Sequence, residues 1–450
     1  MPQHVVIVGG GISGLSAAYD LARAGIPHTL FEKQARLGGV IETRTQDGCI
    51  LECGPDSFLA AKPELLALIK ELGLDGEIIG SNDFQRTTHI LKHGVLVPLP
   101  EGVMMIVPTK VVPMVQSNLL GWGSKIRMGL ELLRGPRTYP DRSVAEFVSD
   151  HFGQETLDYL AEPLLSGVYG GDPRDLSADS VLPRFVEMEK TKGSLGRAVM
   201  AAKRPPATPG NSLFKTLASG LGTVIETLAT YANVRHENIE TIERRGDGFQ
   251  VRAGGEWIDA SNVIVATPAH AASVLLKDAD PELAKLLAAI PYSSSAIVSM
   301  IFDEKKFDGQ RAGFGFLVPK RERDRLAACT FVGTKFPHRA PDDRILLRCF
   351  FGGTGDEAIL NESDESLITI AREELRRILG LTAAPLYTTV SRWPKSMAQY
   401  NVGHRVRITE IKKRTDAIPG LHLAGNAYDG IGLPDCVRSG RQAAGKIPRL

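Results

Sequence analysis

A glycine cluster that follows a short apolar run constrains this chain more than any other feature. Apolar residues 4–8 lead into the sequence G-x-G-x-x-G at residues 9–14, and a helical pattern continues over residues 15–24. A second apolar run, residues 28–31, ends at Glu32. Strand, tight turn, helix and strand in this order predict a βαβ unit, and therefore a parallel sheet with a right-handed crossover.

The glycine positions match a binding site for the pyrophosphate of a dinucleotide. Gly9 permits the tight turn, Gly11 lets the backbone approach the pyrophosphate, and Gly14 lets the helix pack closely against the strand. The first N–H groups of the helix and its dipole then face the phosphates. Glu32 ends the second strand, where a carboxylate accepts hydrogen bonds from ribose hydroxyls. The N-terminal unit therefore predicts a dinucleotide-binding domain.

Two further glycine-rich segments favour FAD over NAD. Gly38 and Gly39 follow shortly after the ribose acid and allow a second close approach of the backbone, although an ordinary surface turn is the alternative. Near the other end of the chain, a predicted strand at residues 421–424 leads into Gly425 and a glycine-rich turn before a helix. The N-terminus of that helix suits the polar end of a flavin ring. Segments at both ends of the chain fit a long, extended FAD better than a compact NAD.

Length and charge exclude several classes of protein. Lys and Arg total 53 and Asp and Glu total 52, so the 450-residue chain has a net charge of +1. Without a global positive field, binding of nucleic acid is not expected. At about 150 residues per domain, the length predicts two to three domains. A composition of 43% hydrophobic and 23% charged residues is typical of a folded globular protein.

The cysteines and the apolar segments favour a cytoplasmic location. Five cysteines, an odd number with no C-x-x-C pair, are typical of free thiols in a reducing compartment. The first residues lead directly into the predicted strand, so we expect no signal peptide. The apolar stretch at residues 103–122 is interrupted by Pro108, Lys110 and Pro113, so a transmembrane helix is not expected.

The remaining patterns predict the domain organisation. The fold class is α/β: a Rossmann-like FAD/NAD(P)-binding domain with an inserted β-rich substrate domain and a helical domain. A proline-rich linker is expected at residues 203–211. The predicted boundaries are residues 1–78, 208–268 and 405–450 for the FAD-binding domain, 79–98 and 269–404 for the substrate-binding domain, and 99–207 for the helical domain.

No metal site is predicted. His89 and His93 are four residues apart, which would suit a zinc pair on a helix, but residues 88–97 alternate like a strand. The charged run at residues 320–325 is mixed in sign and is interpreted as a solvated face. Residues 111–115 are consistent with helical core, with an apolar substrate mouth or with contact to a membrane surface.

Four longer segments carry a resemblance to a known family. Residues 52–58, 162–172, 393–404 and 432–437 resemble segments of the amine-oxidase-like FAD flavoproteins and, within them, the porphyrinogen oxidases of haem biosynthesis. The similarity extends over essentially the whole chain and is strongest to the bacterial branch that oxidises coproporphyrinogen III. The protoporphyrinogen IX branch has an Arg that holds a propionate near Thr88, and this chain lacks it.

The resemblance implies which residues contact FAD. The ADP half would lie on residues 9–14 and Glu32, Ile239 would meet the adenine through its backbone, and Trp393 would border the isoalloxazine ring. No residue is expected to link the flavin covalently. The implied cofactor contacts are Gly9, Gly10, Gly11, Ile12, Ser13, Gly14, Glu32, Lys33, Gly38, Gly39, Gly54, Pro55, Asp56, Ser57, Ile239, Trp393, Gly425, Ile431, Gly432 and Leu433.

The resemblance also implies the substrate and the reaction. The tetrapyrrole would lie against Gly167, Val168 and Tyr169, with Lys335 and Arg348 facing it. Arg86 and Lys92 are further candidate cations for its propionates. Six hydrogens would leave the porphyrinogen in three flavin cycles, and O₂ would reoxidise the flavin each time to give H₂O₂. No side chain is identified as catalytic, because the flavin supplies the chemistry.

Other functions and partners stay open at this stage. Protoporphyrinogen IX oxidase is the main alternative, followed by a flavin amine oxidase or carotenoid desaturase, and by a non-catalytic flavoprotein that carries porphyrin. The expected partners are the tetrapyrrole and O₂. Weak contact with a membrane surface and handover of the product to a downstream chelatase are further hypotheses.

Overall fold

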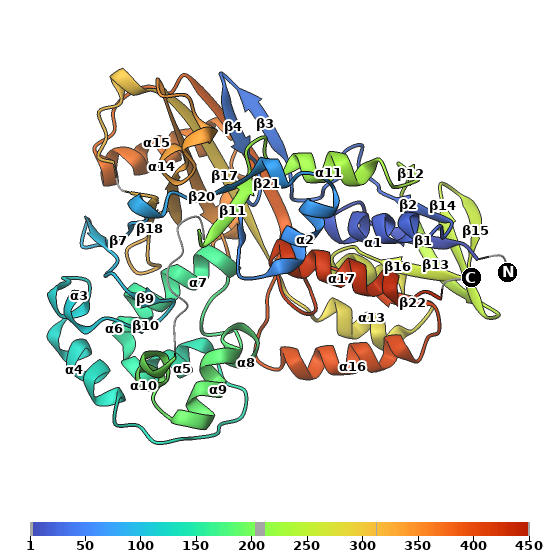
Figure 1. The fold of residues 1–450 in the computed structure, drawn as a ribbon, viewed down its shortest axis with the longest axis horizontal. Helices are drawn as coiled ribbons and strands as arrows, with labels where there is room; N and C mark the ends of the chain where they lie inside the picture. The colour runs from blue at the N-terminus through green and yellow to red at the C-terminus, as the bar shows by residue number, and fades with distance from the viewer. Residues whose placement is uncertain (1–2, 203–211, 312, 449–450) are drawn as a thin grey trace.

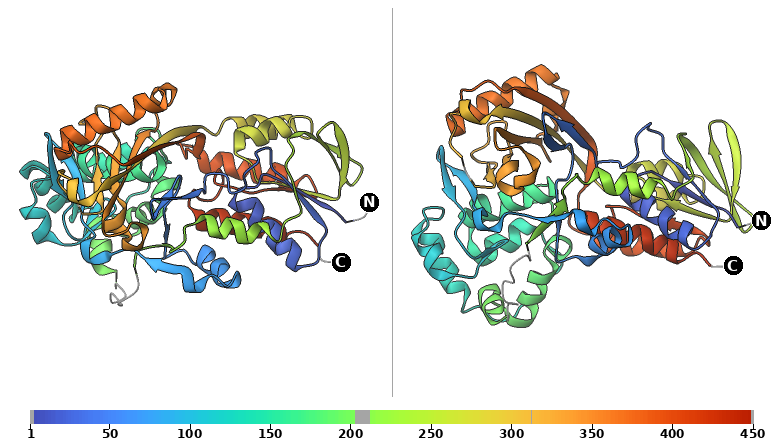
Figure 2. Two further views of the ribbon diagram at one scale, coloured as in Figure 1. Left: turned by 90° about the horizontal axis from the view of Figure 1, so that it is seen from above. Right: turned by 45° about the horizontal axis from the view of Figure 1, so that its top comes forward.

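The computed structural model describes residues 3–202, 212–311 and 313–448, so the predicted linker at residues 203–211 lies outside them. The molecule is elongated (Figure 1). Both described ends of the chain lie at one end of the molecule, beside a parallel sheet, and a larger sheet and a group of helices form the other end (Figure 2).

The predicted βαβ unit forms the centre of a five-stranded parallel sheet. β1 pairs with β2 on one side and with β16 on the other, in register from Val5 to Val8. The order is β12 (Val234–Arg235), β2 (His28–Phe31), β1 (Val5–Val8), β16 (Asn262–Val265) and β22 (Leu421–Leu423). The strands come from three distant parts of the chain, so this domain is discontinuous.

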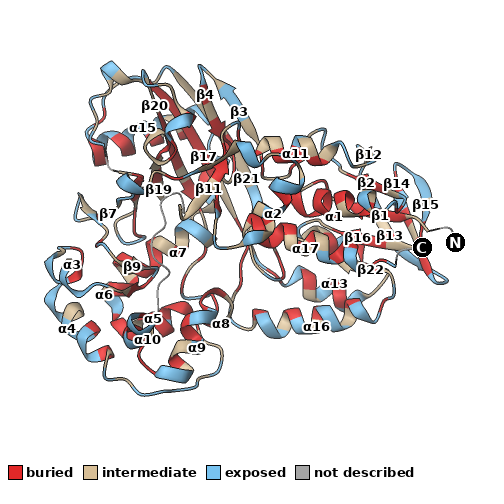
Figure 3. Cartoon of the chain, in the orientation of Figure 1, coloured by how far each residue is buried: buried red, intermediate tan, exposed pale blue. Residues whose placement is uncertain are grey.

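Alternate residues of β1 enter two different cores, because successive side chains of a strand point to opposite faces. Val5 and Ile7 pack with α1 (Ile12–Arg23), α2 (Pro63–Glu71), α11 (Gly222–Ala229) and α17 (Leu433–Gly445). Val6 and Val8 pack with the antiparallel strands β13 (Ile239–Arg245), β14 (Gly248–Ala253) and β15 (Glu256–Ala260), and with α12 (Ala269–Leu275), α13 (Pro281–Ala288) and α16 (His404–Asp416). Both faces of the sheet are therefore covered, and its three central strands, β2, β1 and β16, are largely buried (Figure 3).

A seven-stranded sheet forms the β-rich part. Its order is β21 (Tyr387–Ala398), β17 (Tyr292–Asp303), β20 (Arg344–Gly352), β19 (Ala328–Phe331), β18 (Gly315–Leu317), β7 (Thr88–Lys92) and β8 (Val95–Pro98). β7 and β18 pair in parallel, and the other neighbours are antiparallel. Phe302 and Leu347 pack with Leu375 of α15 (Asp364–Leu379). The strand predicted around His89 is confirmed as β7.

The helical part follows β8. Ser143 caps its central helix α5 through a reciprocal bond pair with Glu146, as expected of an S-x-x-E sequence. The helical stretch over residues 154–169 contains a wide π turn at Leu157–Ala161, shortly before Pro163, which has no N–H to donate. The helices are α3 (Val111–Gln116), α4 (Trp122–Glu131), α5 (Val144–Phe152), α6 (Gln154–Thr156), α7 (Glu162–Tyr169), α8 (Ala178–Val181), α9 (Pro183–Lys192) and α10 (Leu195–Ala201).

Short elements connect these parts. They are the pair β3 (Thr43–Gln46) and β4 (Cys49–Glu52), the sheet β5 (Phe58–Leu59), β11 (Phe214–Leu217) and β6 (Ile78–Gly80), the pair β9 (Val103–Met104) and β10 (Val107–Pro108), α14 (Val332–Lys335), and the 3₁₀ turns η1 (Asp75–Glu77), η2 (Asp83–Gln85), η4 (Glu304–Lys306), η5 (Pro337–Arg339) and η6 (Glu357–Asn361).

The predicted α/β class, with a Rossmann-like part, a β-rich part and a helical part, is confirmed. One predicted boundary differs from the packing: α12 and α13, assigned to the substrate-binding domain, share a core with β13 and α16 on the nucleotide side. We therefore propose that the substrate-binding part begins near β17, and the other boundaries stay predictions. None of the described helices combines the length and the apolar character needed to cross a bilayer.

Candidate cofactor and substrate site

Two helices begin side by side at the carboxyl edge of the parallel sheet. α1 starts directly after β1, and α17 starts after the loop that follows β22. The helices touch where a Cβ on Gly440 would lie 2.0 Å from the carbonyl oxygen of Ser13. The Ser13 hydroxyl donates to the carbonyl of Cys436 over 3.0 Å. The positive ends of two helix dipoles therefore face the same region, which favours a ligand with negative charge.

The glycines of the first loop fall into two groups. A Cβ on Gly9 would lie 2.9 Å from the carbonyl oxygen of Ala266, and its φ of +109° is one that L residues rarely adopt. A Cβ on Gly14 would lie 2.0 Å from the carbonyl oxygen of Gly9. These two glycines are therefore required by the packing of the protein itself.

Gly11 belongs to the other group. A Cβ placed there would have no protein atom within 4 Å, and one on Gly425 would have its nearest neighbour, the carbonyl oxygen of Thr267, at 3.9 Å. Gly39 lies against Gly11, with 3.5 Å between its Cβ position and the Gly11 Cα. Packing does not demand glycine at these positions. The positive φ of Gly39 (+60°) and Gly425 (+129°) favours glycine by itself, and the free space beside all three leaves room for a ligand against the backbone. The residues present therefore fit a dinucleotide that approaches the chain here.

Glu32 lies beside this backbone. Its carboxylate accepts hydrogen bonds from the N–H groups of Gly10 and Gln34, over 2.8 and 2.9 Å. Both oxygens keep lone pairs that can accept from ribose hydroxyls. The N–H of Glu32 donates to the carbonyl of Arg235, which places Ile239 at the start of β13 nearby, with its side chain buried. The side chain of Lys33, another predicted contact, is exposed.

Arg36 organises the second glycine loop, a role that sequence reasoning missed. Its guanidinium donates to the carbonyls of Leu37 and Ile41, over 2.8 and 2.7 Å, and to the carbonyl of Gly39. The guanidinium carbon also lies 6.0 Å from the ring centroid of Trp393. A basic residue two positions before a glycine pair was the available signal, because such a side chain can bind the carbonyls of its own loop.

Trp393 and Gly54 continue the same surface. The indole Nε1 of Trp393 donates to the carbonyl of Cys53 over 2.6 Å. A Cβ on Gly54 would lie 1.9 Å from the carbonyl oxygen of Val40 and 3.8 Å from the Trp393 ring. The structure therefore brings Gly11, Gly39, Gly54 and Trp393 into one continuous row, as an extended cofactor requires.

Asp56 lies in a cluster of buried charges next to this row. The Lys335 ammonium is 3.0 Å from both carboxylate oxygens, and Arg348 is 3.4 Å from one of them. Ser57 Oγ donates to the same carboxylate over 2.6 Å. Burial raises the pKa of Asp56, but the two cations and the hydroxyl outweigh it and hold the pKa well below its usual range. Asp56 therefore stays ionised.

Lys335 and Arg348 are predicted to face the substrate, but the structure gives both an internal partner. Arg348 is 1% exposed and also donates to the carbonyl of Gly54 over 2.5 Å. A second buried pair, Arg339 with Glu52 at 2.7 Å, lies close by, and Arg339 also donates to the Thr216 hydroxyl. The pairing of these cations with carboxylates could not be read from the sequence. Contact of Lys335 and Arg348 with a substrate stays a prediction.

Gly167, Val168 and Tyr169 form the last turn of α7. Gly167 and Val168 are exposed, and Tyr169 is half-buried with its ring 6.5 Å from that of Tyr400. A Cβ on Gly167 would lie 3.6 Å from the Leu317 side chain of β18. The segment predicted to meet the macrocycle therefore lies at the contact between the helical part and the β-rich part.

Tyr400 connects this turn to the C-terminal glycine loop, and sequence reasoning missed its role. Its hydroxyl donates to the carbonyl of Asn426 and accepts from the N–H of Gly430, each over 2.8 Å. Burial raises the pKa of Tyr169 to about 12 and the pKa of Tyr400 above its ordinary value. Both phenols therefore stay neutral, and the wall that they form carries no charge.

Bonds of Asp435 hold the start of α17 in place. Asp435 is buried in its first turn, accepts from the N–H of Gly432 over 3.3 Å and pairs with Lys62 and with Arg438. These bonds hold the predicted contacts Ile431, Gly432 and Leu433 next to the segment that follows Ser57. The structure thus brings the N-terminal, middle and C-terminal predicted contacts together, and the role of each residue toward a cofactor stays a prediction.

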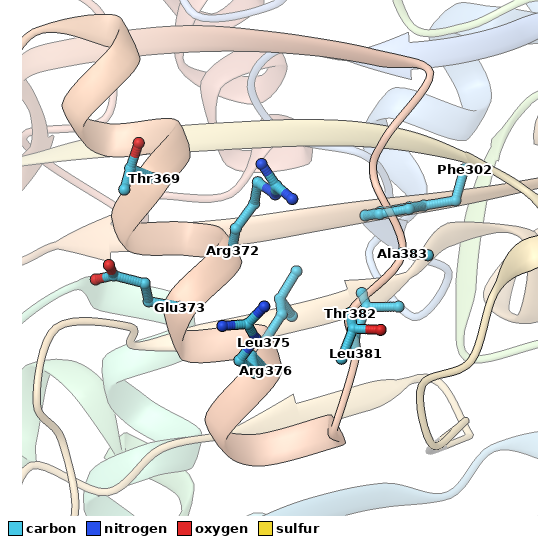
Figure 4. A pocket seen from close by; sticks show the side chains of 9 residues that line it. All are labelled: Phe302, Thr369, Arg372, Glu373, Leu375, Arg376, Leu381, Thr382 and Ala383. Carbon is cyan, nitrogen blue, oxygen red and sulfur yellow. The ribbon is translucent and has the colours of Figure 1, made fainter.

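A pocket of about 210 Å³ lies between α15 and the segment that follows it (Figure 4). It contains Arg372 and Arg376 and is bordered by Phe302. Phe302 points to the α15 face of its sheet, whereas Arg348, in register with Ser299, points to the opposite face toward Gly54. The pocket is therefore separated from the candidate site by the sheet.

Asp150, His151 and Glu189 are close enough to hold a metal ion, with ligand atoms within 4.8 Å of one another. Both nitrogens of His151 instead contact carboxylates, Glu131 at 2.9 Å and Glu189 at 3.0 Å. Arg142 pairs with Asp150 and with Glu189. Because the carboxylates are already neutralised by side chains, this group is explained as a structural charge cluster.

The site fits an extended dinucleotide, and comparison with known proteins shows that the class is the flavin-dependent oxidoreductases. Residues 12–448 match the model of the family of flavin containing amine oxidoreductases. The chain belongs to this family. The predicted cofactor, FAD, is thereby confirmed, as is the prediction of an oxidoreductase.

Individual relatives show which branch of this family the chain resembles. The chain is 34% identical to coproporphyrinogen III oxidase of Bacillus subtilis, over 98% of this chain and 97% of that one. It is 29% identical to protoporphyrinogen oxidase 1 of Arabidopsis thaliana, over 98% of this chain and 87% of that one. The resemblance to porphyrinogen oxidases is therefore confirmed.

Solved structures support the same fold. A crystal structure of a protein from Exiguobacterium sp. 255-15 is 34% identical and superposes with a TM-score of 0.87, over 99% of this chain and 98% of that one. A putrescine oxidase structure at 20% identity superposes with a TM-score of 0.70, over 98% of both chains. The second similarity concerns the fold alone.

Proposed function

We propose that this protein oxidises coproporphyrinogen III to coproporphyrin III, with FAD as cofactor and O₂ as electron acceptor. The observation that carries the proposal is the match, over 98% of this chain, to a relative of that name. The geometry supports it through the row of backbone positions, open to a ligand at Gly11, Gly39 and Gly425, that an extended dinucleotide needs. Bound FAD would accept two electrons per cycle, so one substrate needs three cycles.

The chain's own residues would bind, orient and exclude water. We propose that residues 9–14, Glu32 and Ile239 hold the ADP half, and that Gly54 and Trp393 border the ring. Gly167, Val168 and Tyr169 would position one face of the macrocycle within about 3–3.5 Å of the reacting flavin atom. The neutral phenols of Tyr169 and Tyr400 suit an apolar macrocycle, because burying an unpaired charge beside it would be costly.

Steady-state oxygen consumption tests the substrate. We expect kcat/KM for coproporphyrinogen III to exceed that for protoporphyrinogen IX by about tenfold, which requires only about 1.4 kcal/mol of differential transition-state stabilisation. Both substrates are assayed in the same detergent and at the same oxygen concentration. A preference for protoporphyrinogen IX would overturn the proposed substrate. Oxidation of amines alone would overturn the proposed reaction.

The Gly11→Val variant tests the placement of the cofactor. The structure has room for the side chain, so we expect the variant to fold but to lose most of its flavin, because valine occupies the space of the pyrophosphate. Gly123→Val is the matched control, since a Cβ there also meets nothing and the position lies on α4. The measurement is the ratio of flavin to protein absorbance, and acid release of free flavin tests the non-covalent binding. Full flavin content in Gly11→Val would contradict the placement.

We also propose that α3 and α4 touch an anionic membrane surface. Trp122, Ile126 and Leu130 recur at every fourth residue of α4 and are 67, 62 and 59% exposed, so one apolar face of the helix lies in solvent (Figure 3). Val111 and Val112 of α3 are similarly exposed, and the Lys125 ammonium lies 4.8 Å from the ring centroid of Trp122. Lys110 is paired with Glu101, and Arg127 donates to carbonyls of α5. An exposed apolar face with basic residues and a tryptophan is typical of helices that lie in the interface of a bilayer.

Sedimentation with vesicles tests this contact. We expect binding to vesicles that contain phosphatidylglycerol and weaker binding to purely zwitterionic ones. Ile126→Ser should reduce the bound fraction, whereas Val274→Ser, at an equally exposed apolar residue of α12, should not. Equal binding by both variants would contradict the proposal. The five free cysteines support the cytoplasmic location that we also propose, and handover of the product to a chelatase stays a prediction.

A further inference from the structure

The segment that contains η2 bridges the two ends of the candidate site. At its start, the N–H of Asn82 donates to the carbonyl of Lys335 over 2.9 Å, and the Lys335 ammonium holds Asp56. At its end, β7 pairs with β18, whose Leu317 touches Gly167. The bridge therefore runs from the residues proposed at the flavin to those proposed at the macrocycle.

The turn within this bridge is held firmly by its backbone neighbours. Ser81 N–H donates to the carbonyl of Phe214 over 3.0 Å, and its hydroxyl donates to Asp83 over 2.8 Å. The carbonyl of Thr87 accepts from the N–H of Phe314 over 2.8 Å. One side of the turn is therefore tied to β11 of the three-stranded sheet and the other to the residue before β18 of the seven-stranded sheet, so the side chains at its centre project from a held backbone.

Phe84, at the centre of η2, is fully exposed. Burial of a phenylalanine side chain against a ligand would be worth about 1.5–3 kcal/mol. The segment before it gives no reason for an apolar residue, because Asn82 and Asp83 are polar and the strand begins only at Thr88. A flat aromatic ligand would supply the missing contact.

Of the four cations predicted to bind the propionates of the substrate, only one lies in the η2 turn and has no partner within the described part of the chain. Lys92 bonds to Glu155 and to the carbonyl of Leu119, while Lys335 and Arg348 are paired with Asp56. Arg86 is exposed and, among the residues that the structure describes, has no hydrogen-bond or ion-pair partner. It is therefore the cation that remains available for an external carboxylate.

From these observations we infer that Phe84 and Arg86 determine specificity for the tetrapyrrole: Phe84 packs against the edge of the macrocycle and Arg86 pairs with a propionate. This inference rests on the proposed function and adds the residues that select a substrate with several carboxylates. An arginine at the rim, in contact with solvent, can pair with a carboxylate without the cost of burying either charge.

Binding of coproporphyrin III, the oxidised product, to the flavin-loaded protein tests the inference without turnover. The quenching of porphyrin fluorescence gives Kd, and protoporphyrin IX, with two propionates instead of four, serves as the comparison. We expect Phe84→Ala to raise the Kd of both porphyrins by about tenfold. Arg86→Gln should weaken binding of coproporphyrin III more than binding of protoporphyrin IX. Arg86→Lys should restore part of the affinity.

Arg372→Gln, at the exposed arginine of the pocket in Figure 4, is the matched control and should leave both affinities unchanged. Flavin content shows that each variant has folded. Wild-type affinities in both Phe84→Ala and Arg86→Gln would overturn the inference and leave the proposed function standing. Failure of the wild-type protein to bind or oxidise any porphyrin compound would instead overturn the proposed function.

Discussion

Two buried charge clusters stabilise opposite parts of the molecule, and they are built in opposite ways. At the junction between the nucleotide-binding and β-rich parts, two cations, Lys335 and Arg348, surround the single carboxylate of Asp56. In the helical part, two carboxylates, Glu131 and Glu189, enclose the imidazole of His151. The first cluster adjoins the proposed flavin contacts, whereas the second joins helices to one another.

The difference indicates that the Asp56 cluster serves the cofactor site and that the His151 cluster only stabilises the helical part. Asp56 is predicted to contact the cofactor, and its partners come from the β-rich part, so this cluster fixes the site and joins two parts of the chain. The helical cluster joins α4, α5 and α9, and the Glu131 carboxylate also accepts from the N–H groups of Leu195 and Gly196 at the start of α10. We therefore expect damage to the first cluster to remove flavin, and damage to the second to lower stability alone.

The largest effect is expected from Asp56→Asn. Removing this charge leaves Lys335 and the buried Arg348 without their anion, which typically costs about 3–5 kcal/mol of unfolding free energy. Thermal melting and flavin content should both fall. Asp324→Asn, at an exposed aspartate with no partner in the described chain, should change neither. Wild-type stability together with full flavin content in Asp56→Asn would contradict the role given to this cluster.

A smaller loss is expected from His151→Gln. The glutamine amide has both N–H groups on one nitrogen and carries no positive charge, so it cannot replace an imidazolium that bonds Glu131 and Glu189 through opposite ring nitrogens. We expect a loss of about 2–3 kcal/mol with flavin content unchanged. His338→Gln, at an exposed histidine, is the control. Loss of flavin in folded His151→Gln would show that the two clusters are not independent.

The dependence of stability on pH should have opposite signs at the two clusters. The pKa of Asp56 is lowered in the folded protein, so its contribution is present above about pH 4 and is lost as the pH falls toward the folded pKa. Burial lowers the pKa of His151, but its bonds to Glu131 and Glu189 raise it overall. Its contribution is therefore complete below about pH 6.5 and is lost as the pH rises through the folded pKa.

Melting temperatures measured from pH 2 to 9 check these signs. Asp56→Asn should flatten the acid side of the profile and His151→Gln the neutral-to-alkaline side. A His151→Gln profile parallel to that of the wild type would mean that the imidazole is not charged in the folded state.

The smallest effects are expected from the serines of the two clusters. Ser57 donates to Asp56, and Ser194 caps α10 while donating to Glu131 over 2.8 Å. Each Ser→Ala change should cost about 1 kcal/mol. Chemical denaturation measures both, and only Ser57→Ala should also weaken flavin binding. If Ser194→Ala weakened flavin binding and Ser57→Ala did not, the roles given to the two clusters would be wrong.

Local patterns predicted the nucleotide-binding part well because its signals are close in sequence. The βαβ unit over residues 4–32 and the strand before Gly425 were confirmed, since hydrophobic period and glycine position determine them. Pairings between distant residues could not be predicted from local patterns. Lys335 and Asp56 are 279 positions apart, and neither local sequence indicates that the two side chains pair.

One local interpretation was correct only in part, for a related reason: Lys320, Arg321, Asp324 and Arg325 are exposed, but the two residues between them are half-buried. The mixed charges of residues 320–325 indicated a solvated face, but Glu322 accepts from the hydroxyl of Tyr159 over 2.6 Å and from the N–H of His93 over 3.0 Å. The partners of a charged residue in a loop depend on what packs over that loop. Composition alone does not contain this information.

Anaerobic mixing with coproporphyrinogen III tests the central claim most directly. The account predicts that the visible band of the flavin bleaches while the Soret band of the porphyrin grows, with three equivalents of flavin reduced for each porphyrin formed. Admission of O₂ should restore the flavin band and produce H₂O₂. A flavin that stays oxidised with coproporphyrinogen III but bleaches with a primary amine would contradict the account.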